Sequence, residues 1–240
     1  MTVVHGGKSI YAASVGILTL ESSFPRIPGD IGNALTWPFP VHYRVVSGAS
    51  PDLIVRHNGK DMLPLFIAAA QDLVAAGADG ITTSCGFLAL MQHEISAAVS
   101  VPVATSALMQ VPMVQATLPP GKRVGVITIF KPTLTDEHLN AANVPLDTPI
   151  VGTENGSAFT AGILDGHLQL NIDDCRQDLL DAAQLLVTEH ENLGAIVLEC
   201  TNMVPYAADI RKAIGLPVYS MYSYICWFQT GLMPRRFPLY

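Results

Sequence analysis

Apolar residues in this chain form short continuous runs of strand length, separated by stretches in which they recur at helical spacing. The runs that predict buried strands are 15–20, 41–46, 81–84, 124–129 and 196–199. Residues 62–76 and 178–189 predict helices, and Gly77 ends the first of them. Short apolar strands that alternate with helices favour parallel sheets covered on both faces.

The pattern occurs twice. The segment SVGILTL at 14–20 returns as RVGVITI at 123–129, and GITTSC at 80–85 aligns with AIVLEC at 195–200. A shift of 115 residues carries Cys85 onto Cys200, and a proline follows 17 positions after each of these cysteines. The order and spacing hold over most of the chain, so the sequence predicts an internal duplication.

The duplication predicts an α/β fold of two pseudo-twofold-related sub-domains, each a doubly wound parallel sheet, with the active site between them. The closing strand and helix, within residues 216–232, correspond to the segment that starts at residue 101. We therefore expect each half to take its closing segment from the far end of the other. The first half would comprise residues 1–114 with 219–240, and the second residues 115–218.

Charge and composition narrow the possible partners. Only 14% of the residues are charged, and the net charge of −7 comes with scattered lysines and arginines, so we expect no nucleic-acid partner. The uncharged runs at 95–121 and 213–234 contain prolines and polar residues, and each predicts a buried strand followed by a core helix rather than a membrane span.

Other features bear on location and cofactors. No CxxC spacing and no leader-like segment are visible, which predicts a cytoplasmic protein with free thiols. Histidines lack metal-ligand spacing and no GxGxxG follows a strand, so we expect no metal and no cofactor.

Cys85 and Cys200 are the candidate catalytic residues. Each is predicted at the carboxyl end of a strand, before a short turn and a helix, where backbone N–H groups favour the thiolate and can hold a substrate carboxylate. Two facing thiols can remove a proton from one side of a carbon and deliver one to the other. A lone cysteine is usually a small core residue, and Cys175 and Cys226, which have no partner in the repeat, are interpreted in that way.

The duplicated halves, with TTSCGF at 82–87 and LECTN at 198–202, resemble the aspartate/glutamate racemase superfamily, which includes hydantoin racemases, maleate isomerases and arylmalonate decarboxylases. The resemblance implies a cofactor-independent enzyme with two cysteines at a domain interface, and it implies that Thr201 contacts the substrate. The usual Cys-Asn-Thr of amino-acid racemases is replaced by Cys85-Gly86-Phe87, and LESS at 20–23 stands where glutamate racemases carry Asp-Ser-Gly.

The function predicted from these features is an isomerase of amino-acid metabolism: a racemase that inverts the carbon next to a carboxylate. The alternatives are a maleate isomerase-like or arylmalonate decarboxylase-like reaction, a hydantoin racemase and, from another class, a non-catalytic two-lobed binding protein. The expected partners are a small carboxylate-bearing substrate and a second copy of the chain, as a homodimer. The predicted substrate-binding residues are Ser22, Gly86, Phe87, Phe130, Thr201 and Asn202.

Overall fold

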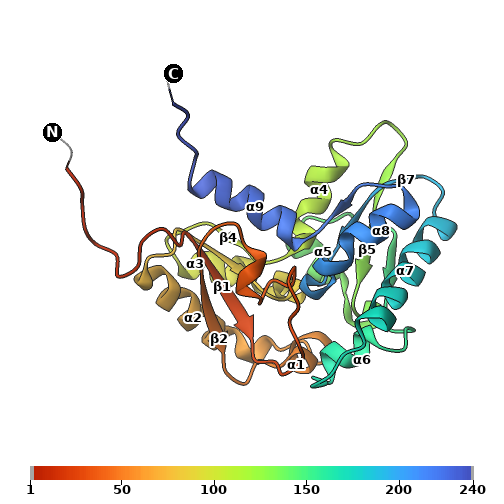
Figure 1. Cartoon of the computed structure of the whole chain (residues 1–240), viewed down its shortest axis with the longest axis horizontal. Coiled ribbons are helices and arrows are strands. Elements are labelled where there is room, and N and C mark those ends of the chain that lie inside the picture. The colour runs from red at the N-terminus through yellow and green to blue at the C-terminus, as the bar shows by residue number, and fades with distance from the viewer. Residues whose placement is uncertain (1–2, 239–240) are drawn as a thin grey trace.

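A computed structural model describes residues 3–238 and contains two four-stranded sheets in which every strand pair is parallel. The first sheet has the order β2-β1-β3-β4, with β1 Val15–Leu20, β2 Val41–Val46, β3 Gly80–Thr83 and β4 Val103–Ala104. The second has the order β6-β5-β7-β8, with β5 Arg123–Thr128, β6 Ile150–Gly152, β7 Leu193–Leu198 and β8 Val218–Tyr219. Figure 1 shows the two sheets side by side, the first in red to yellow and the second in green to blue.

Helices pack on both sheets. They are α1 Pro51–Arg56, α2 Leu63–Ala76, α3 Gln92–Ala98, α4 Gln110–Gln115, α5 Asp136–Ala141, α6 Phe159–Leu164, α7 Ile172–Glu189, α8 Ala207–Ile214 and α9 Met221–Leu232. Short 3-10 helices span Ala34–Thr36, Lys60–Met62, Gly86–Met91, Ala107–Met109, Lys131–Thr133 and Thr201–Tyr206. Within residues 3–238, none of the helices has both the length and the apolar character needed to cross a bilayer.

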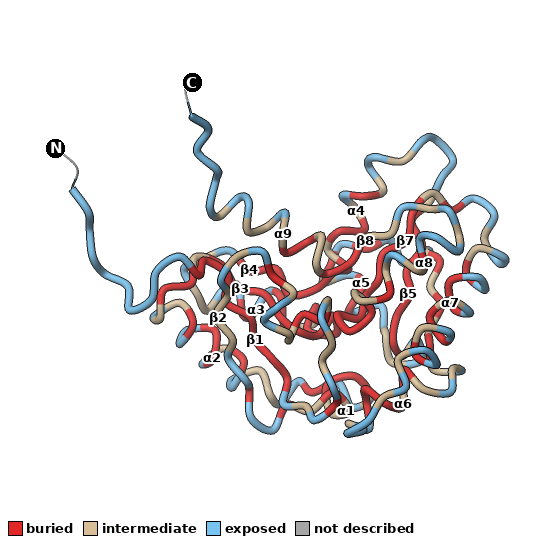
Figure 2. Tube along the Cα trace, viewed as in Figure 1, coloured by how far each residue is buried: buried red, intermediate tan, exposed pale blue. Residues whose placement is uncertain are grey.

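The core follows from this layering. Every residue of β1 is buried, because helices cover both faces of a parallel sheet, whereas the edge strand β2 is largely accessible. Figure 2 shows buried backbone running through both sheets and through the region where they meet. The two halves therefore share one interior at the ends of their central strands.

The predicted fold class is confirmed: the two sheets have equivalent strand order. The 3-10 helices after the two cysteines, at Gly86–Met91 and Thr201–Tyr206, are also related by the 115-residue shift. Helix α9 contacts both β8 and β3, which belong to different sheets, and it crosses the upper side of the molecule in Figure 1. The division at residues 114/115 and 218/219 stays a prediction.

Two local features differ from the sequence prediction. Helix α7 begins at Ile172, six residues earlier than expected, because the side chain of Asn171 caps it by accepting hydrogen bonds from the N–H groups of Asp173 and Asp174. The expected turns after the cysteines are 3-10 helices, and α3 and α8 begin only after them.

Candidate active site

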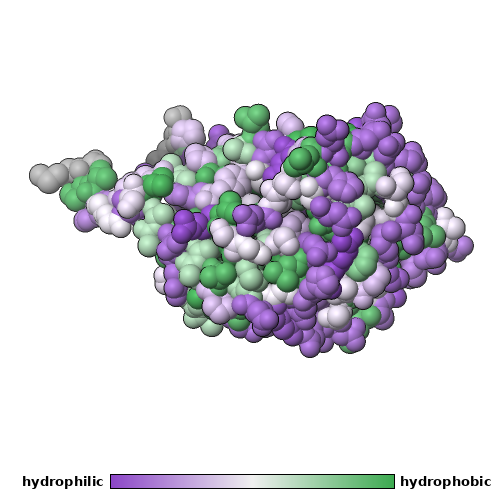
Figure 3. Space-filling model, turned by 90° about the horizontal axis from the view of Figure 1, so that it is seen from below, coloured by the Kyte–Doolittle hydropathy of each residue, from purple (hydrophilic) through white to green (hydrophobic). Residues whose placement is uncertain are grey.

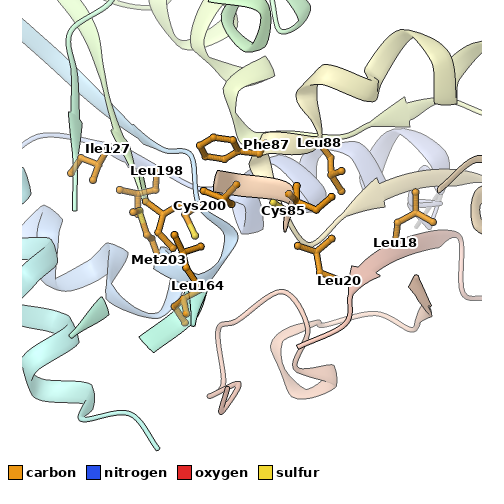
Figure 4. Close-up of a cluster of buried hydrophobic side chains, with 14 of the residues drawn as sticks. Leu18, Leu20, Cys85, Phe87, Leu88, Ile127, Leu164, Leu198, Cys200 and Met203 are labelled. Atoms are coloured by element: carbon orange, nitrogen blue, oxygen red, sulfur yellow. The ribbon is translucent and has the colours of Figure 1, made fainter. Parts of the chain in front are cut away.

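Cys85 and Cys200 lie just beyond the carboxyl ends of β3 and β7, where each has an extended backbone and precedes a 3-10 helix. The edges of the two sheets at which these strands end meet at the centre of the molecule. Both cysteines line one cavity there, and Figure 4 shows them side by side, near Phe87 and Leu164. The two thiols, from opposite halves of the chain, are thus brought together in one site.

A hydrogen bond joins the two strand ends directly. The hydroxyl of Thr201, in the second half, donates to the backbone carbonyl of Ser84, in the first half, over 2.6 Å. Thr201 is fully buried, so this bond is shielded from water. In this conformation the Thr201 hydroxyl holds the halves together.

The cavity is almost closed. Its volume of about 20 Å³ is enough for one water-sized molecule and too small for a carboxylic acid. Its lining consists of Leu20, Phe24, Arg26, Pro51, Val55, Ser84, Cys85, Gly86, Phe87, Ile129, Ile163, Leu164, Glu199, Cys200, Thr201 and Asn202. A substrate must therefore enter through a movement of the surrounding elements.

An open groove of about 450 Å³ adjoins the cavity and shares Pro51 and Leu164 with it. These residues belong to α1 and α6, which come from different halves and contact each other. An ion pair between Arg56, at the end of α1, and Asp165, just after α6, also joins the halves, with an N–O distance of 2.5 Å. Figure 3 views the molecule from this side, where hydrophilic residues surround small apolar patches. We take this groove as the route to the cavity.

Both thiols are difficult to ionise in this conformation. Burial, and then the nearby Glu199 carboxylate, raise the pKa of the Cys85 thiol to about 12, although N–H groups of Phe87 and Leu88 favour its thiolate. The same two causes raise the pKa of the Cys200 thiol well above its usual range. The predicted effect of the backbone N–H groups is present, but desolvation outweighs it, so both thiols stay protonated in the closed site.

Glu199 is a carboxylate that is 1% exposed and lines the cavity. Its Oε2 accepts hydrogen bonds from the Thr128 hydroxyl at 2.8 Å and from the Ile129 N–H at 3.4 Å. Among residues 3–238, its Oε1 has no hydrogen-bond partner. Burial raises the pKa of this carboxyl to about 7.

Gly86 leaves the space that Glu199 occupies. A β-carbon at residue 86 would lie 2.1 Å from Oε1 of Glu199 and 2.5 Å from the Glu199 carbonyl oxygen. The asparagine that amino-acid racemases usually carry after the first cysteine would overlap this carboxylate. Glycine thus replaces asparagine after the first cysteine at the position where the Glu199 side chain, from the other half, fills the space.

A chain of polar contacts extends from Cys200 to a partly buried cation, Arg26. The Cys200 thiol donates to Oδ1 of Asn202 at 3.5 Å, and the Asn202 amide donates to Asp30 at 2.6 Å. Arg26 donates to the other oxygen of Asp30 at 2.7 Å and to the Ser22 hydroxyl at 2.9 Å. Arg26 is the one cationic side chain among the residues that line the cavity, and it is suited to meet a carboxylate there.

Of the eight residues singled out from the sequence, six line the cavity and two do not. Ser22 lies in the adjoining groove and supports Arg26. Phe130 lines neither the cavity nor the groove, and the Arg56 guanidinium lies 5.7 Å from the centre of its ring.

Sequence reasoning missed Glu199, Arg26 and Asp30. A glutamate directly before the second cysteine, at the end of an apolar strand, was the visible signal for Glu199. Arg26 and Asp30 lie in the irregular segment after β1, where the repeat gives no guide.

Solved structures share this architecture. A liganded variant of arylmalonate decarboxylase aligns with a TM-score of 0.61 at 14% identity, over 92% of each chain. The aspartate racemase of Picrophilus torridus aligns with a TM-score of 0.55 at 13% identity, over 93% of this chain and 95% of that one. The chain has the fold of the aspartate/glutamate racemase superfamily. No protein-family model matches the sequence.

The curated relatives found by sequence are named for a different activity, that of a lyase. A dimethylsulfoniopropionate lyase from Durusdinium sp. clade D is 28% identical over 243 residues, covering 96% of this chain and 79% of that one. Dimethylsulfoniopropionate lyase 3 of Emiliania huxleyi is 30% identical over 219 residues, covering 86% of this chain. The chain spans 56% of the length of that second relative.

These relatives overturn the predicted reaction. The sequence-based prediction of an amino-acid racemase, and with it of an isomerase, is wrong, because the curated relatives are named as lyases. The physical reason is that racemisation and elimination both begin with removal of a proton next to a carboxylate, and decarboxylation passes through a carbanion at the same carbon. The substituents of the substrate decide which follows, and the strand–cysteine motif does not encode them.

Proposed function

We propose that this chain is a lyase that cleaves dimethylsulfoniopropionate, or a close analogue, by β-elimination. The support comes from the lyases named above and from a site that combines two thiols with one partly buried cation, Arg26. The substrate suggested by those names carries a carboxylate at one end and a dimethylsulfonium group on the β-carbon.

The reaction balances with a single base. A thiolate takes a proton from the carbon next to the carboxylate, and the electron pair of that C–H bond forms the new carbon–carbon double bond. The bond from the β-carbon to sulfur breaks, and its electron pair leaves with neutral dimethyl sulfide. The products are acrylate, dimethyl sulfide and a proton on the thiol, which then returns to solvent.

We assign the base to Cys85. Two backbone N–H groups, from Phe87 and Leu88, and the charge of Arg26 act to favour its thiolate. The Cys200 thiol instead donates a hydrogen bond to the Asn202 side chain, and one backbone N–H, from Asn202, favours its thiolate while the Asp30 charge disfavours it. Arg26, on the cavity wall, pairs with the substrate carboxylate and places its α-carbon near the sulfur.

Incubation of the reduced protein with dimethylsulfoniopropionate tests the function. Headspace gas chromatography should detect dimethyl sulfide, and proton NMR should detect acrylate in equal amount. The control is the double variant Cys85→Ser/Cys200→Ser. Release no faster than in this control would overturn the proposal, and so would decarboxylation of a phenylmalonate by a protein that releases no dimethyl sulfide.

The cytoplasmic location, the homodimer and the lack of nucleic-acid partners stay predictions. Gel filtration with light scattering would test the assembly.

A further inference from the structure

The proposed elimination by a thiolate gives no role to Glu199, whose Oε1 has no hydrogen-bond partner among residues 3–238. The carboxylate is 1% exposed, and a buried ionised group without a partner is costly. Three other buried side-chain atoms within residues 3–238 lack partners, on Ser14, His42 and His138, and none of these residues lines the cavity. Of these four residues, Glu199 is therefore the one that brings an unsatisfied polar atom to the candidate site.

We infer that Glu199 receives the cationic substituent of the substrate and selects zwitterionic onium carboxylates over neutral analogues. This inference rests on the proposed function for its ligand class. A sulfonium or quaternary ammonium group has no N–H to donate, so it is recognised by charge and by apolar contact rather than by hydrogen bonds.

The surroundings of Glu199 suit such a group. Most of the lining is apolar, with Phe24, Ile163 and Leu164 among the contributing residues, and it can contact the methyl groups of an onium ion. Arg26 supplies the opposite charge for the carboxylate. The cavity thus holds one carboxylate and one guanidinium for a substrate that carries one charge of each sign.

A bound cation would also assist the chemistry. The Glu199 charge disfavours both thiolates in the empty site. An onium group beside Glu199 offsets that charge, so the thiolate forms more readily once substrate is present. Glu199 is then a specificity-determining residue that also keeps the base neutral until the cation arrives.

A matched pair of ligands tests the inference without turnover. 3-(Trimethylammonio)propanoate and 4,4-dimethylpentanoate have nearly the same shape and differ in the charge of one central atom. Isothermal titration calorimetry should show that the wild-type protein binds the ammonium compound at least tenfold more tightly. In Glu199→Gln the two affinities should differ by less than about twofold, with binding of the neutral compound kept.

Glu189→Gln is the control, because it removes the same charge from an exposed position at the end of α7. It should keep the wild-type preference. Circular dichroism checks the fold of each variant, and Glu199→Asp, which withdraws the carboxylate by one methylene, should weaken the preference if Glu199→Gln does not fold.

Equal affinities in the wild-type protein would overturn the inference, as would a full preference in a folded Glu199→Gln or Glu199→Asp. The proposed function can fail separately. If the protein prefers the ammonium compound but releases no dimethyl sulfide, the inference about Glu199 stands and the proposed reaction is wrong.

Discussion

Gly86 and Glu199 fit together across the interface between the two halves: a β-carbon on residue 86 would lie 2.1 Å from Oε1 of the glutamate. Gly86 follows β3 in the first sheet, and Glu199 follows β7, the equivalent strand of the second sheet. The residue after the first cysteine must therefore be small because the residue before the second cysteine is a glutamate. The close approach also holds the carboxylate beside both thiols.

We expect Gly86→Ala to destabilise the protein by about 1–3 kcal/mol, as overpacking of a filled interior does. The double variant Gly86→Ala/Glu199→Ala should recover part of this loss, because the side chain that collides with the new methyl group is gone. Urea unfolding of the two single variants and the double variant measures the coupling. Strictly additive changes would show that the two residues do not collide.

The two cysteines should not contribute equally to elimination. Cys85→Ser should lower kcat/KM by about 10²–10⁴-fold, the usual contribution of a general base. Cys200→Ser should retain the larger share of activity, because one proton acceptor suffices for the reaction. Dimethyl sulfide release by both purified variants gives the comparison. Equal losses, or a greater loss for Cys200→Ser, would contradict the assignment of the base to Cys85.

The activity should increase with pH. Below the Cys85 pKa of about 12, the thiolate fraction of the free enzyme grows tenfold per pH unit, so kcat/KM should rise throughout the neutral and mildly alkaline range. An additional rise should centre near pH 7, where Glu199 ionises and gains the charge that attracts the cation.

Profiles of kcat/KM from pH 5.5 to 9.5, corrected for spontaneous cleavage, measure both effects. Glu199→Gln should lack the rise near pH 7 and keep the alkaline one. A bell-shaped wild-type profile with its maximum below pH 7 would contradict the thiolate base.

Breaking the ion pair between Arg56 and Asp165 should open the site. Asp165→Asn should change the free energy of unfolding by less than about 1 kcal/mol, since the pair is solvent-accessible. It should increase the alkylation rate of Cys85 and Cys200 by iodoacetamide several-fold, because α1 and α6 separate more easily.

Asp52→Asn is the matched control. Asp52 pairs with the same arginine but lies on the same helix, so its loss removes no contact between the halves. Mass spectrometry of the alkylated peptides reports each cysteine separately. If both variants alkylate at the wild-type rate, the ion pair does not limit access.

The repeat in the sequence was enough to predict the positions of the two thiols. In both halves a cysteine directly follows an apolar run of strand length. Because this local pattern shows where each strand ends, it also places each cysteine at the carboxyl end of its strand. The contacts of Glu199 could not be predicted in this way. Its neighbours Gly86 and Thr128 come from opposite halves, and only the packing of one half on the other brings them together.

Arg26 was beyond sequence reasoning for a different reason. It lies in an irregular segment whose shape depends on hydrogen bonds to Asp30 and Ser22 rather than on a helical or strand period. The start of α6, which supplies Ile163 and Leu164 to the cavity, depends in turn on N–H groups bound by the Asp178 carboxylate of α7.

The hydrogen bond from Thr201 to Ser84 joins the two halves where their central strands end, so we expect this junction to act as the hinge when the site opens. The chain atoms next to both sulfurs are tied there by a buried contact, whereas the rim at α1 and α6 is held by an accessible ion pair. We therefore expect opening to move the rim at α1 and α6 more than the strand ends beside the thiols. Strand ends that stay joined would keep the two cysteines in place while substrate enters and products leave, so that the reactive groups would not have to be reassembled after each turnover.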